Sequence, residues 1–254
     1  MKIVLTFDIE RDIPNILNTY FGVKVGLLKI LKLLDNFHIN ATFFCTGNVA
    51  EHLPEYIRLI ERKGHEIACH GLSHGRLNHY NLKKCQEIIS KNKKIIENVC
   101  QNSEIIGFRS PYLDPPRYLF KVLNNLGYKY DSSLKSHKKV QFYHNYNNGI
   151  QEFPPSNYNI FFRIPINYSL LLKWILKKKI IILYFHPKEV INMKDVIRNQ
   201  MSAFNKFLNL SYRPDRWFYT GDIFTTKIHN FIKGALLKKA EFLTLKQLYF
   251  QERQ

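Results

Sequence analysis

Short apolar runs alternate with amphipathic segments along the first half of the chain, and this alternation constrains the fold more than any other feature. Apolar runs at residues 3–7, 42–45 and 66–69 are separated by segments of helical periodicity at residues 25–37 and 54–63. Strand–helix–strand repeats with short connections predict a parallel sheet, because parallel strands need a crossover between them. The chain is therefore expected to belong to the α/β class.

The middle of the chain continues this pattern. We expect strands at residues 105–109, 128–133 and 180–185, helices at residues 82–100 and 115–126, and an irregular loop over the site at residues 136–159. All six expected strands end beside polar residues, and parallel α/β folds gather such strand ends at one face. We predict an irregular β/α barrel with a ring of site residues at one mouth. At 254 residues it is expected to form a single domain.

The last quarter of the chain is organised but carries no chemical signal. Helices are expected at residues 190–208 and 228–239, and short strands at residues 217–220 and 242–244. No residue after His186 points to a function.

The chain is strongly basic, with a formal net charge of +18. This charge predicts attraction to polyanions such as nucleic acid, an anionic membrane surface or an acidic glycan. An AT-rich genome, which favours lysine codons, explains it equally well. No nucleic-acid-binding motif is recognisable, so nucleic acid is disfavoured as a partner. With 45% hydrophobic and 14% aromatic residues, the composition is that of a globular protein.

Cysteine spacing and hydropathy predict a cytoplasmic location. The four cysteines show no Cys-x-x-Cys spacing, and we interpret them as reduced thiols. A strand begins directly after Met1 with no apolar leader, and lysines interrupt the longest apolar run, at residues 169–185. The basic segment formed by Lys173 and Lys177-Lys178-Lys179 is compatible with peripheral contact at an anionic membrane face.

Two histidines follow the third expected strand directly, at His70 and His74. If the chain turns into a helix there, histidines four residues apart lie on one face and can bind one metal ion. Asp8 and Glu10 lie at the end of the first expected strand. Catalytic zinc usually takes three protein ligands and leaves a position open for water, so a carboxylate near two histidines predicts a metal site.

Five linked motifs resemble the polysaccharide deacetylase family, also called the NodB homology domain or carbohydrate esterase family 4. They are Thr6-Phe7-Asp8, Ala41-Thr42-Phe43-Phe44, Gly64-His65-Glu66-Ile67 with His70-x3-His74, Arg109-Ser110-Pro111-Tyr112, and Leu183-x2-His186. The resemblance covers roughly residues 2–190. Residues 1–190 are therefore expected to form the catalytic domain, and residues 191–254 an extension that completes or decorates it.

The resemblance implies an irregular β/α barrel, a divalent metal that is usually zinc, and hydrolysis of an N-acetyl group on an amino sugar. It also implies a role for each matched residue: Asp8 as the base, Glu10, His70 and His74 as metal ligands, Arg109 as the partner of the base, the backbone N–H near Tyr112 as an oxyanion donor, His186 as the acid, and Asp131 as its orienting partner.

Two positions depart from the commonest family pattern. Ile9 separates Asp8 from Glu10, which resembles the branch with an Asp-x-Glu first motif, and Asp12 is an alternative third ligand. In a strand, residues i and i+2 share a face, so both carboxylates can still point to the mouth. No tryptophan follows Asp131. The role of Asp131 and the shape of the sugar groove therefore stay open.

These features lead to the hypothesis of a metal-dependent hydrolase that removes an N-acetyl, or alternatively an N-formyl, group from an amino sugar. The substrate is expected to be a glycan or a lipid-linked glycan precursor built inside the cell. Two alternatives stay open, namely a related amidohydrolase that acts on a small non-sugar amide and a catalytically inactive glycan-binding module.

Overall fold

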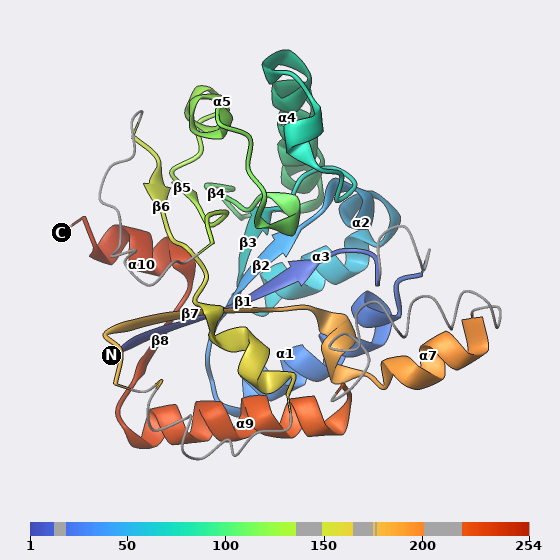
Figure 1. Cartoon of the computed structure of the whole chain (residues 1–254), viewed down its shortest axis with the longest axis vertical. Coiled ribbons are helices and arrows are strands. Elements are labelled where there is room, and N and C mark those ends of the chain that lie inside the picture. The colour runs from blue at the N-terminus through green and yellow to red at the C-terminus, as the bar shows by residue number, and fades with distance from the viewer. Residues whose placement is uncertain (13–18, 136–148, 165–174, 176, 201–219, 254) are drawn as a thin grey trace.

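The structure is a computed structural model that describes residues 1–12, 19–135, 149–164, 175, 177–200 and 220–253. Its centre is a curled, wholly parallel sheet (Figure 1). The strands are β1 (Lys2–Ile9), β2 (Thr42–Cys45), β3 (Glu66–Cys69), β4 (Gly107–Phe108), β5 (Tyr130–Asp131), β6 (Gln151–Glu152), β7 (Ile180–Phe185) and β8 (Glu241–Leu243). Their order is β6-β5-β4-β3-β2-β1-β7, and β8 also pairs with β1.

Strand β1 is the axis of this sheet because it pairs with three other strands. β7 runs along Lys2 to Phe7, whereas β8 pairs with Lys2 to Val4 and β2 pairs with Thr6 to Ile9. A strand has two edges, so β8 and β2 share one edge of β1 in succession. On the far side, Ser156 N donates a hydrogen bond of 2.7 Å to the carbonyl of Ile182 on β7. The chain after β6 thereby closes the curl toward a barrel, as the sequence predicted.

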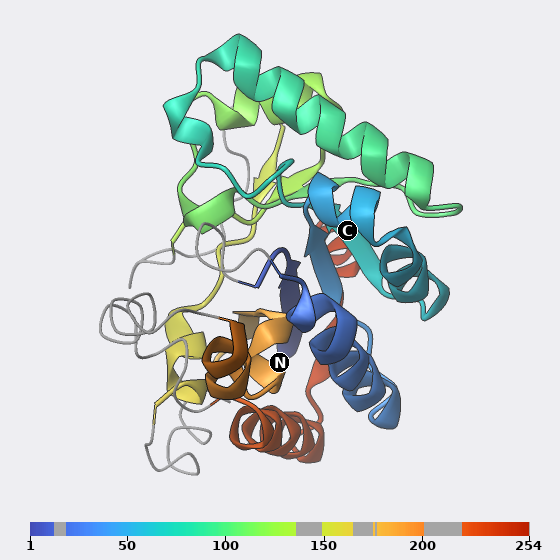
Figure 2. The same cartoon turned by 90° about the vertical axis from the view of Figure 1, so that its right-hand side faces the viewer.

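Helices lie around the outside of the sheet (Figures 1 and 2). They are α1 (Leu27–Asn36) after a π-helical turn η1 (Gly22–Gly26), α2 (Gly47–His52), α3 (Pro54–Arg62), α4 (Leu82–Val99), α5 (Leu119–Asn125), α7 (Met193–Gln200) and α9 (Asp222–Leu237). Among the described residues, four 3-10 turns each follow a strand: η2 (Leu77–His79), η3 (Pro111–Leu113), η4 (Asn157–Phe162) and η5 (Pro187–Val190). Apolar residues at helical spacing explain α1, which buries Leu27, Ile30, Leu31 and Leu34 against the sheet.

The inside of the sheet has an apolar core of its own, which helix α10 (Leu245–Gln251) completes. It contains Val4, Phe44, Ala68, Ile106, Tyr130, Phe153, Ile182, Leu243, Leu245, Leu248 and Tyr249. The first two N–H groups of α10 donate to Thr42 Oγ1 (2.8 Å) and Glu66 Oε2 (2.9 Å), at the start of β2 and β3. Helix α10 therefore closes the N-terminal end of the barrel.

The predicted strands at residues 3–7, 42–45, 66–69 and 180–185 are confirmed. Several other expectations were wrong. Helix α2 was not predicted, α5 begins at Leu119 and not at Pro115, and β6 and η4 lie within the stretch expected to be an irregular loop. Part of that stretch (136–148), most of the expected strand at 217–220, and Lys173 lie outside the described residues. No helix among the described residues is long and apolar enough to cross a bilayer.

The buried carboxylate of Glu66 should contribute strongly to stability. It accepts hydrogen bonds from Thr42 Oγ1 (2.7 Å), Tyr130 Oη (2.6 Å) and Lys246 N (2.9 Å). Glu66→Ala leaves three donors without an acceptor inside the barrel, and we expect a loss of about 3 kcal/mol in the free energy of unfolding, measured with chemical denaturant.

Glu104→Ala is the matched control, because Glu104 also contacts Lys246 but its side chain is 66% exposed. We expect this variant to change stability by less than about 1 kcal/mol. Equal effects of the two substitutions would contradict the role assigned to Glu66.

Candidate active site

The inward faces of three strands change from apolar to polar along their length. Alternate residues of a strand share a face, so a two-residue step from the inner core reaches the mouth of the barrel. The side chains in question are Val4, Thr6 and Asp8 of β1 with Glu10 directly after it, Ala68 of β3 with His70 directly after it, and Ile182 and Tyr184 of β7 with His186 directly after it. The two-residue alternation of each strand therefore places apolar side chains inside one end of the barrel and titratable side chains at its other end.

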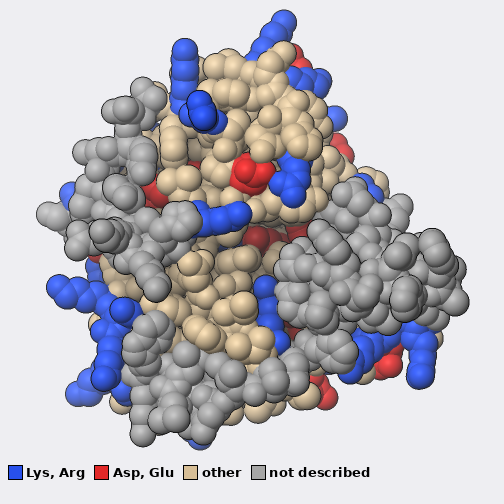
Figure 3. Space-filling view, viewed as in Figure 1, with Lys and Arg blue, Asp and Glu red and all other residues tan. Residues whose placement is uncertain are grey.

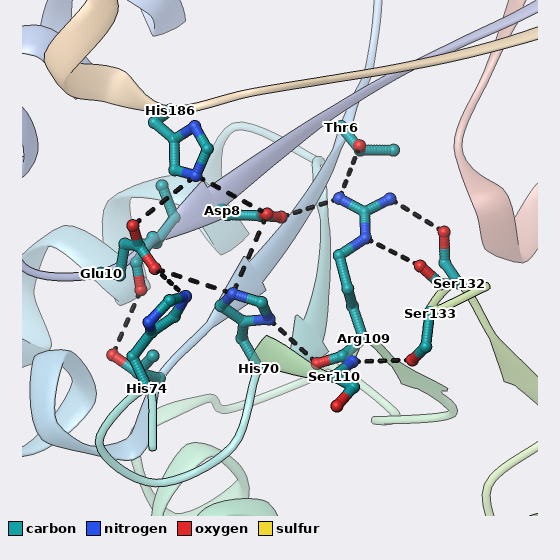
Figure 4. Close-up of polar contacts among 12 residues, drawn as sticks. Thr6, Asp8, Glu10, His70, His74, Arg109, Ser110, Ser132, Ser133 and His186 are labelled. Carbon is teal, nitrogen blue, oxygen red and sulfur yellow. Dashed lines mark hydrogen bonds and ion pairs between the residues drawn. The ribbon is translucent and has the colours of Figure 1, made fainter. Parts of the chain in front are cut away.

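Glu10, His70 and His74 converge at this mouth, with their candidate ligand atoms within 4.8 Å of one another (Figure 4). His74 Nε2 lies 2.5 Å from Glu10 Oε2, and His70 Nε2 lies 3.8 Å from the same oxygen. The Nδ1 of His70 lies 2.9 Å from the carbonyl of Arg109, to which it can only donate, so Nε2 carries the free lone pair. Burial lowers the pKa of His70 to about 4, despite the charge of Asp8, and this keeps the ring neutral.

The two histidines are not on a helix, contrary to the conditional expectation. The chain after β3 is a loop in which Gly71 has a φ of +72° and His74 a φ of 59°. The left-handed conformation at Gly71 turns the chain beside Pro111, whose Cγ would lie 3.3 Å from an added Cβ. Loop geometry, and not helical spacing, therefore brings the two rings to centroids 5.1 Å apart.

Asp8 forms a buried ion pair with Arg109, with 2.7 Å between Oδ1 and Nη1. The guanidinium also donates to Thr6 Oγ1 (2.9 Å) and to the carbonyl and hydroxyl of Ser132 (3.1 and 2.8 Å). Burial alone would raise the pKa of Asp8, but the positive charge of Arg109, with smaller contributions from the neighbouring histidines, outweighs it and lowers the pKa below its usual value. Asp8 is therefore held as a carboxylate.

Asp12, the alternative third ligand, forms hydrogen bonds to the chain at the start of η1 instead. Its carboxylate accepts hydrogen bonds from Thr19 Oγ1 (2.7 Å), Phe21 N (2.7 Å) and Gly22 N (2.6 Å). These contacts hold the start of η1, and Asp12 is not part of the group formed by Glu10 and the two histidines.

His186 lies across the site from the histidine pair. Its Nε2 is 3.6 Å from Glu10 Oε1 and 4.0 Å from Asp8 Oδ2, and its Nδ1 is 3.8 Å from Glu189 Oε1. Glu189 also accepts a hydrogen bond from the backbone N–H of His186 (2.9 Å) and forms an ion pair with Arg163. Burial would raise the pKa of Glu189, but Arg163 and His186 lower it to about 2.

Asp131 does not contact His186, so the orienting role predicted for it was wrong. Its carboxylate accepts from Ser133 Oγ (2.7 Å) and Ser133 N (3.2 Å). Ser133 Oγ in turn accepts from Ser110 N (2.7 Å). Asp131 thus supports the chain next to Arg109, and Glu189 is the carboxylate that lies on the Nδ1 side of the His186 imidazole.

A cavity of about 400 Å³ opens over these groups. It is lined by Asp8, Glu10, His74, Arg76, Tyr112, Leu113, Asp114, Lys135, Arg163, Tyr184, His186, Lys188 and Glu189. The Tyr112 ring packs on His74 with centroids 4.4 Å apart, and the Arg76 guanidinium lies 4.3 Å from the Tyr112 centroid. Figure 3 shows acidic side chains set back between basic ones near the middle of this face.

Sequence reasoning missed Lys188, Glu189 and Arg163. Lys188 Nζ lies 3.0 Å from Glu10 Oε1, although 178 residues separate the two. For Lys188 and Glu189 the sequence offered one signal, namely that both follow His186 within three residues. Arg163 had none.

This arrangement, in which a carboxylate and two histidines adjoin an Asp–Arg pair and a further histidine on a curled parallel sheet, is a candidate hydrolytic site that could hold a metal ion. The chain belongs to the polysaccharide deacetylase family, whose model matches residues 1–130.

Known proteins are similar over parts of the chain. A peptidoglycan deacetylase of Helicobacter pylori is 28% identical over 123 residues, which is 48% of this chain and 42% of that protein. A chitooligosaccharide deacetylase of Sinorhizobium fredii is 28% identical over 111 residues, 44% of this chain and 46% of the relative. The chain thus spans less than half the length of these curated relatives.

Solved structures share the fold. One, of a protein from Mycobacterium smegmatis of the polysaccharide deacetylase type, superposes with a TM-score of 0.63 at 21% identity and covers 91% of this chain and 90% of that one. Another is a pseudoenzyme of the family from Bacillus anthracis, with a TM-score of 0.61, 13% identity, and coverage of 98% and 65%. Because a pseudoenzyme has the same fold, any argument for activity must rest on the site.

Stability should depend on pH through Asp131 and Glu152, which are paired in register on β5 and β6 and fully buried. Burial raises the pKa of Asp131 to about 6, and burial together with Asp131 raises that of Glu152. The folded protein then holds protons that the unfolded chain releases. Its free energy of unfolding should therefore fall as the pH rises from about 4 through the raised pKa values.

Glu152→Gln removes one of these acids but keeps the oxygen that accepts from Leu134 N (2.9 Å). We expect it to flatten the pH dependence and to stabilise the protein by about 1 to 3 kcal/mol at pH 8, measured by denaturant titration between about pH 5 and 8. Glu97→Gln, at a half-exposed helix position, is the control. Parallel curves for Glu152→Gln and wild type would contradict the interpretation.

Proposed function

We propose that the protein is a metal-dependent hydrolase that removes the N-acetyl group of an amino sugar in a glycan. The observation that carries this proposal is the convergence of Glu10, His70 and His74 next to the Asp8–Arg109 pair within one cavity. The names of the curated relatives, which include peptidoglycan and chitooligosaccharide deacetylases, support the amino-sugar substrate.

The three candidate ligands fit a divalent cation such as Zn²⁺. His70 Nε2 is buried without a hydrogen-bond partner among the described residues, and it faces Glu10 Oε2, the oxygen that also contacts His74. Two imidazoles and one carboxylate form a donor set that zinc accepts, with a position left for water and substrate. A cation held there supplies a Lewis acid that activates water and polarises the amide carbonyl.

Asp8 is proposed as the base that takes a proton from the attacking water. Its contact with Arg109 keeps it ionised, and its second oxygen lies 3.8 Å from His70 Nε2 and so faces the ligand group. Tyr112 lies on the cavity wall, and its backbone N–H is proposed as the second oxyanion donor, as the family resemblance implies.

His186 is proposed as the acid that protonates the departing amine. Its imidazole lies on the opposite side of the cavity from His70 and His74 (Figure 4). Carboxylate oxygens of Asp8, Glu10 and Glu189 lie within 4.0 Å of its ring nitrogens. An acid across from the ligand group allows water to attack on one side while the amine leaves on the other.

An anionic substrate, such as a phosphorylated or lipid-linked glycan precursor, is a further part of the proposal. Four basic residues line the cavity beside four acidic ones, and Arg109 adds a fifth cation directly behind Asp8. A divalent cation in the site would make this balance more positive. Such a site attracts anionic ligands and repels cationic ones.

Acetate release is the direct test. We expect release from N-acetylated oligosaccharides to need a divalent metal and to fall more than about 100-fold in both Asp8→Asn and His70→Ala. Metal analysis should show about one equivalent bound in wild type and in Asp8→Asn, but less in His70→Ala. His229→Ala, on the exposed face of α9, is the control and should match wild type.

The substrate panel decides among the remaining hypotheses. N-formyl sugars, phosphorylated and neutral N-acetyl sugars, and small non-sugar amides are assayed side by side. Preference for a non-sugar amide would favour the related amidohydrolase. Glycan binding with neither metal nor acetate release would identify an inactive module and overturn the proposal.

A further inference from the structure

The two oxygens of Glu10 have different partners. Oε2 faces His74 and His70, whereas Oε1 lies 3.0 Å from the ammonium group of Lys188. Only 11% of the Lys188 side chain and 3% of the Glu10 side chain are exposed. Lys188 therefore places a positive charge, little screened by water, on the back of a candidate metal ligand.

The backbone of Lys188 is held in place by a glycine-lined surface on η1. A Cβ at Gly26 would lie 2.0 Å from the carbonyl oxygen of Pro187, and a Cβ at Gly22 would lie 2.8 Å from the backbone nitrogen of Lys188. The four-residue spacing of these glycines puts both on one side of the turn. Segment η5 can thus pack directly on the η1 backbone, and π-helical turns of this kind are frequent at functional sites.

Asp12 fixes this turn in relation to β1. Its carboxylate accepts from Gly22 N, the residue on which Lys188 packs, and Asp12 itself is two residues beyond Glu10. The backbone of Lys188 and the chain that directly follows Glu10 are consequently both held at the start of η1. The contact between Lys188 and Glu10 therefore depends on the packing of the fold and is not a contact between mobile surface side chains.

We propose that Lys188 is a positioning residue that weakens the affinity of the Glu10, His70 and His74 site for its metal. This inference rests on the proposed function. The ammonium group orients Glu10, which favours metal binding, but it also repels a divalent cation on the other side of the same carboxylate. Two charges of the same sign separated by a single carboxylate and hardly exposed to water repel strongly, so we expect repulsion to dominate.

Lys188→Met tests the charge, because methionine keeps most of the apolar stem. We expect the metal-free variant to bind Zn²⁺ about tenfold more tightly than wild type in competition with a chromophoric chelator at fixed pH and salt. Lys188→Arg keeps the charge and should stay within about twofold of wild type. Lys233→Met, at an exposed position of α9, controls for the loss of a lysine elsewhere.

Thermal unfolding gives a second readout. Metal-free Lys188→Met leaves Glu10 with one positive partner fewer and should unfold at a lower temperature than metal-free wild type, yet gain more from added Zn²⁺.

The possible outcomes separate this inference from the proposed function. Zinc affinity in Lys188→Met that equals or falls below that of wild type would overturn the role of Lys188 and leave the metal site intact. Failure of wild type to bind Zn²⁺ would overturn the metal site, and the inference with it.

Discussion

The guanidinium of Arg109 is the group on which both the sheet and the site depend. It is fully buried, and it binds Thr6 and Asp8 on β1 and Ser132 after β5, while the carbonyl of the same residue binds His70 after β3. A guanidinium keeps its proton in proteins, so each of these acceptors must stay in place for its burial to be tolerated. The ionisation of Asp8, the tautomer of His70 and the spacing of three strands thus all depend on one residue, through its guanidinium and its backbone carbonyl.

The two ends of the barrel show how partners decide the state of a buried carboxylate. Glu66 at the N-terminal end is bound by neutral donors, and burial raises its pKa. Asp8 at the C-terminal end is equally buried, but Arg109 and two histidines lower its pKa. Neutral hydrogen bonds suffice to hold helix α10 at the N-terminal end, whereas Asp8 stays ionised because the full positive charge of Arg109 lies next to it. The end of the barrel that carries cations is the one suited to proton transfer.

Sequence patterns predicted the site to the extent that it follows strand periodicity. Asp8, Glu10, His70 and His186 lie at or directly after the ends of apolar runs, and because the ends of parallel strands meet at one face, this position was enough to predict them at the mouth. β6 was missed because Gln151 and Glu152 are polar, and their burial depends on pairing with β5.

Contacts between distant segments could not be predicted in this way. Asp131 ends a strand as a catalytic residue would, yet Ser133 takes its carboxylate. Lys188 reaches Glu10 only because two glycines of η1 accept the backbone of η5, a match between surfaces that no local pattern encodes. Most of the polar contacts that set protonation states in this site join segments that are distant in the sequence.

Backbone conformation at the rim completes the argument. His74, Tyr112 and Leu113 have φ values of 59°, 63° and 50°, in a region where residues with a Cβ are uncommon. Each costs of order 1 to 3 kcal/mol, and such residues persist only where their surroundings fix them. Here Arg76 lies over the Tyr112 ring and binds Asp114, and the same ring packs on His74. Without these rim contacts His74 could move away from Glu10. The candidate ligand His74 is therefore held by the packing of a neighbouring loop as much as by the loop to which it belongs.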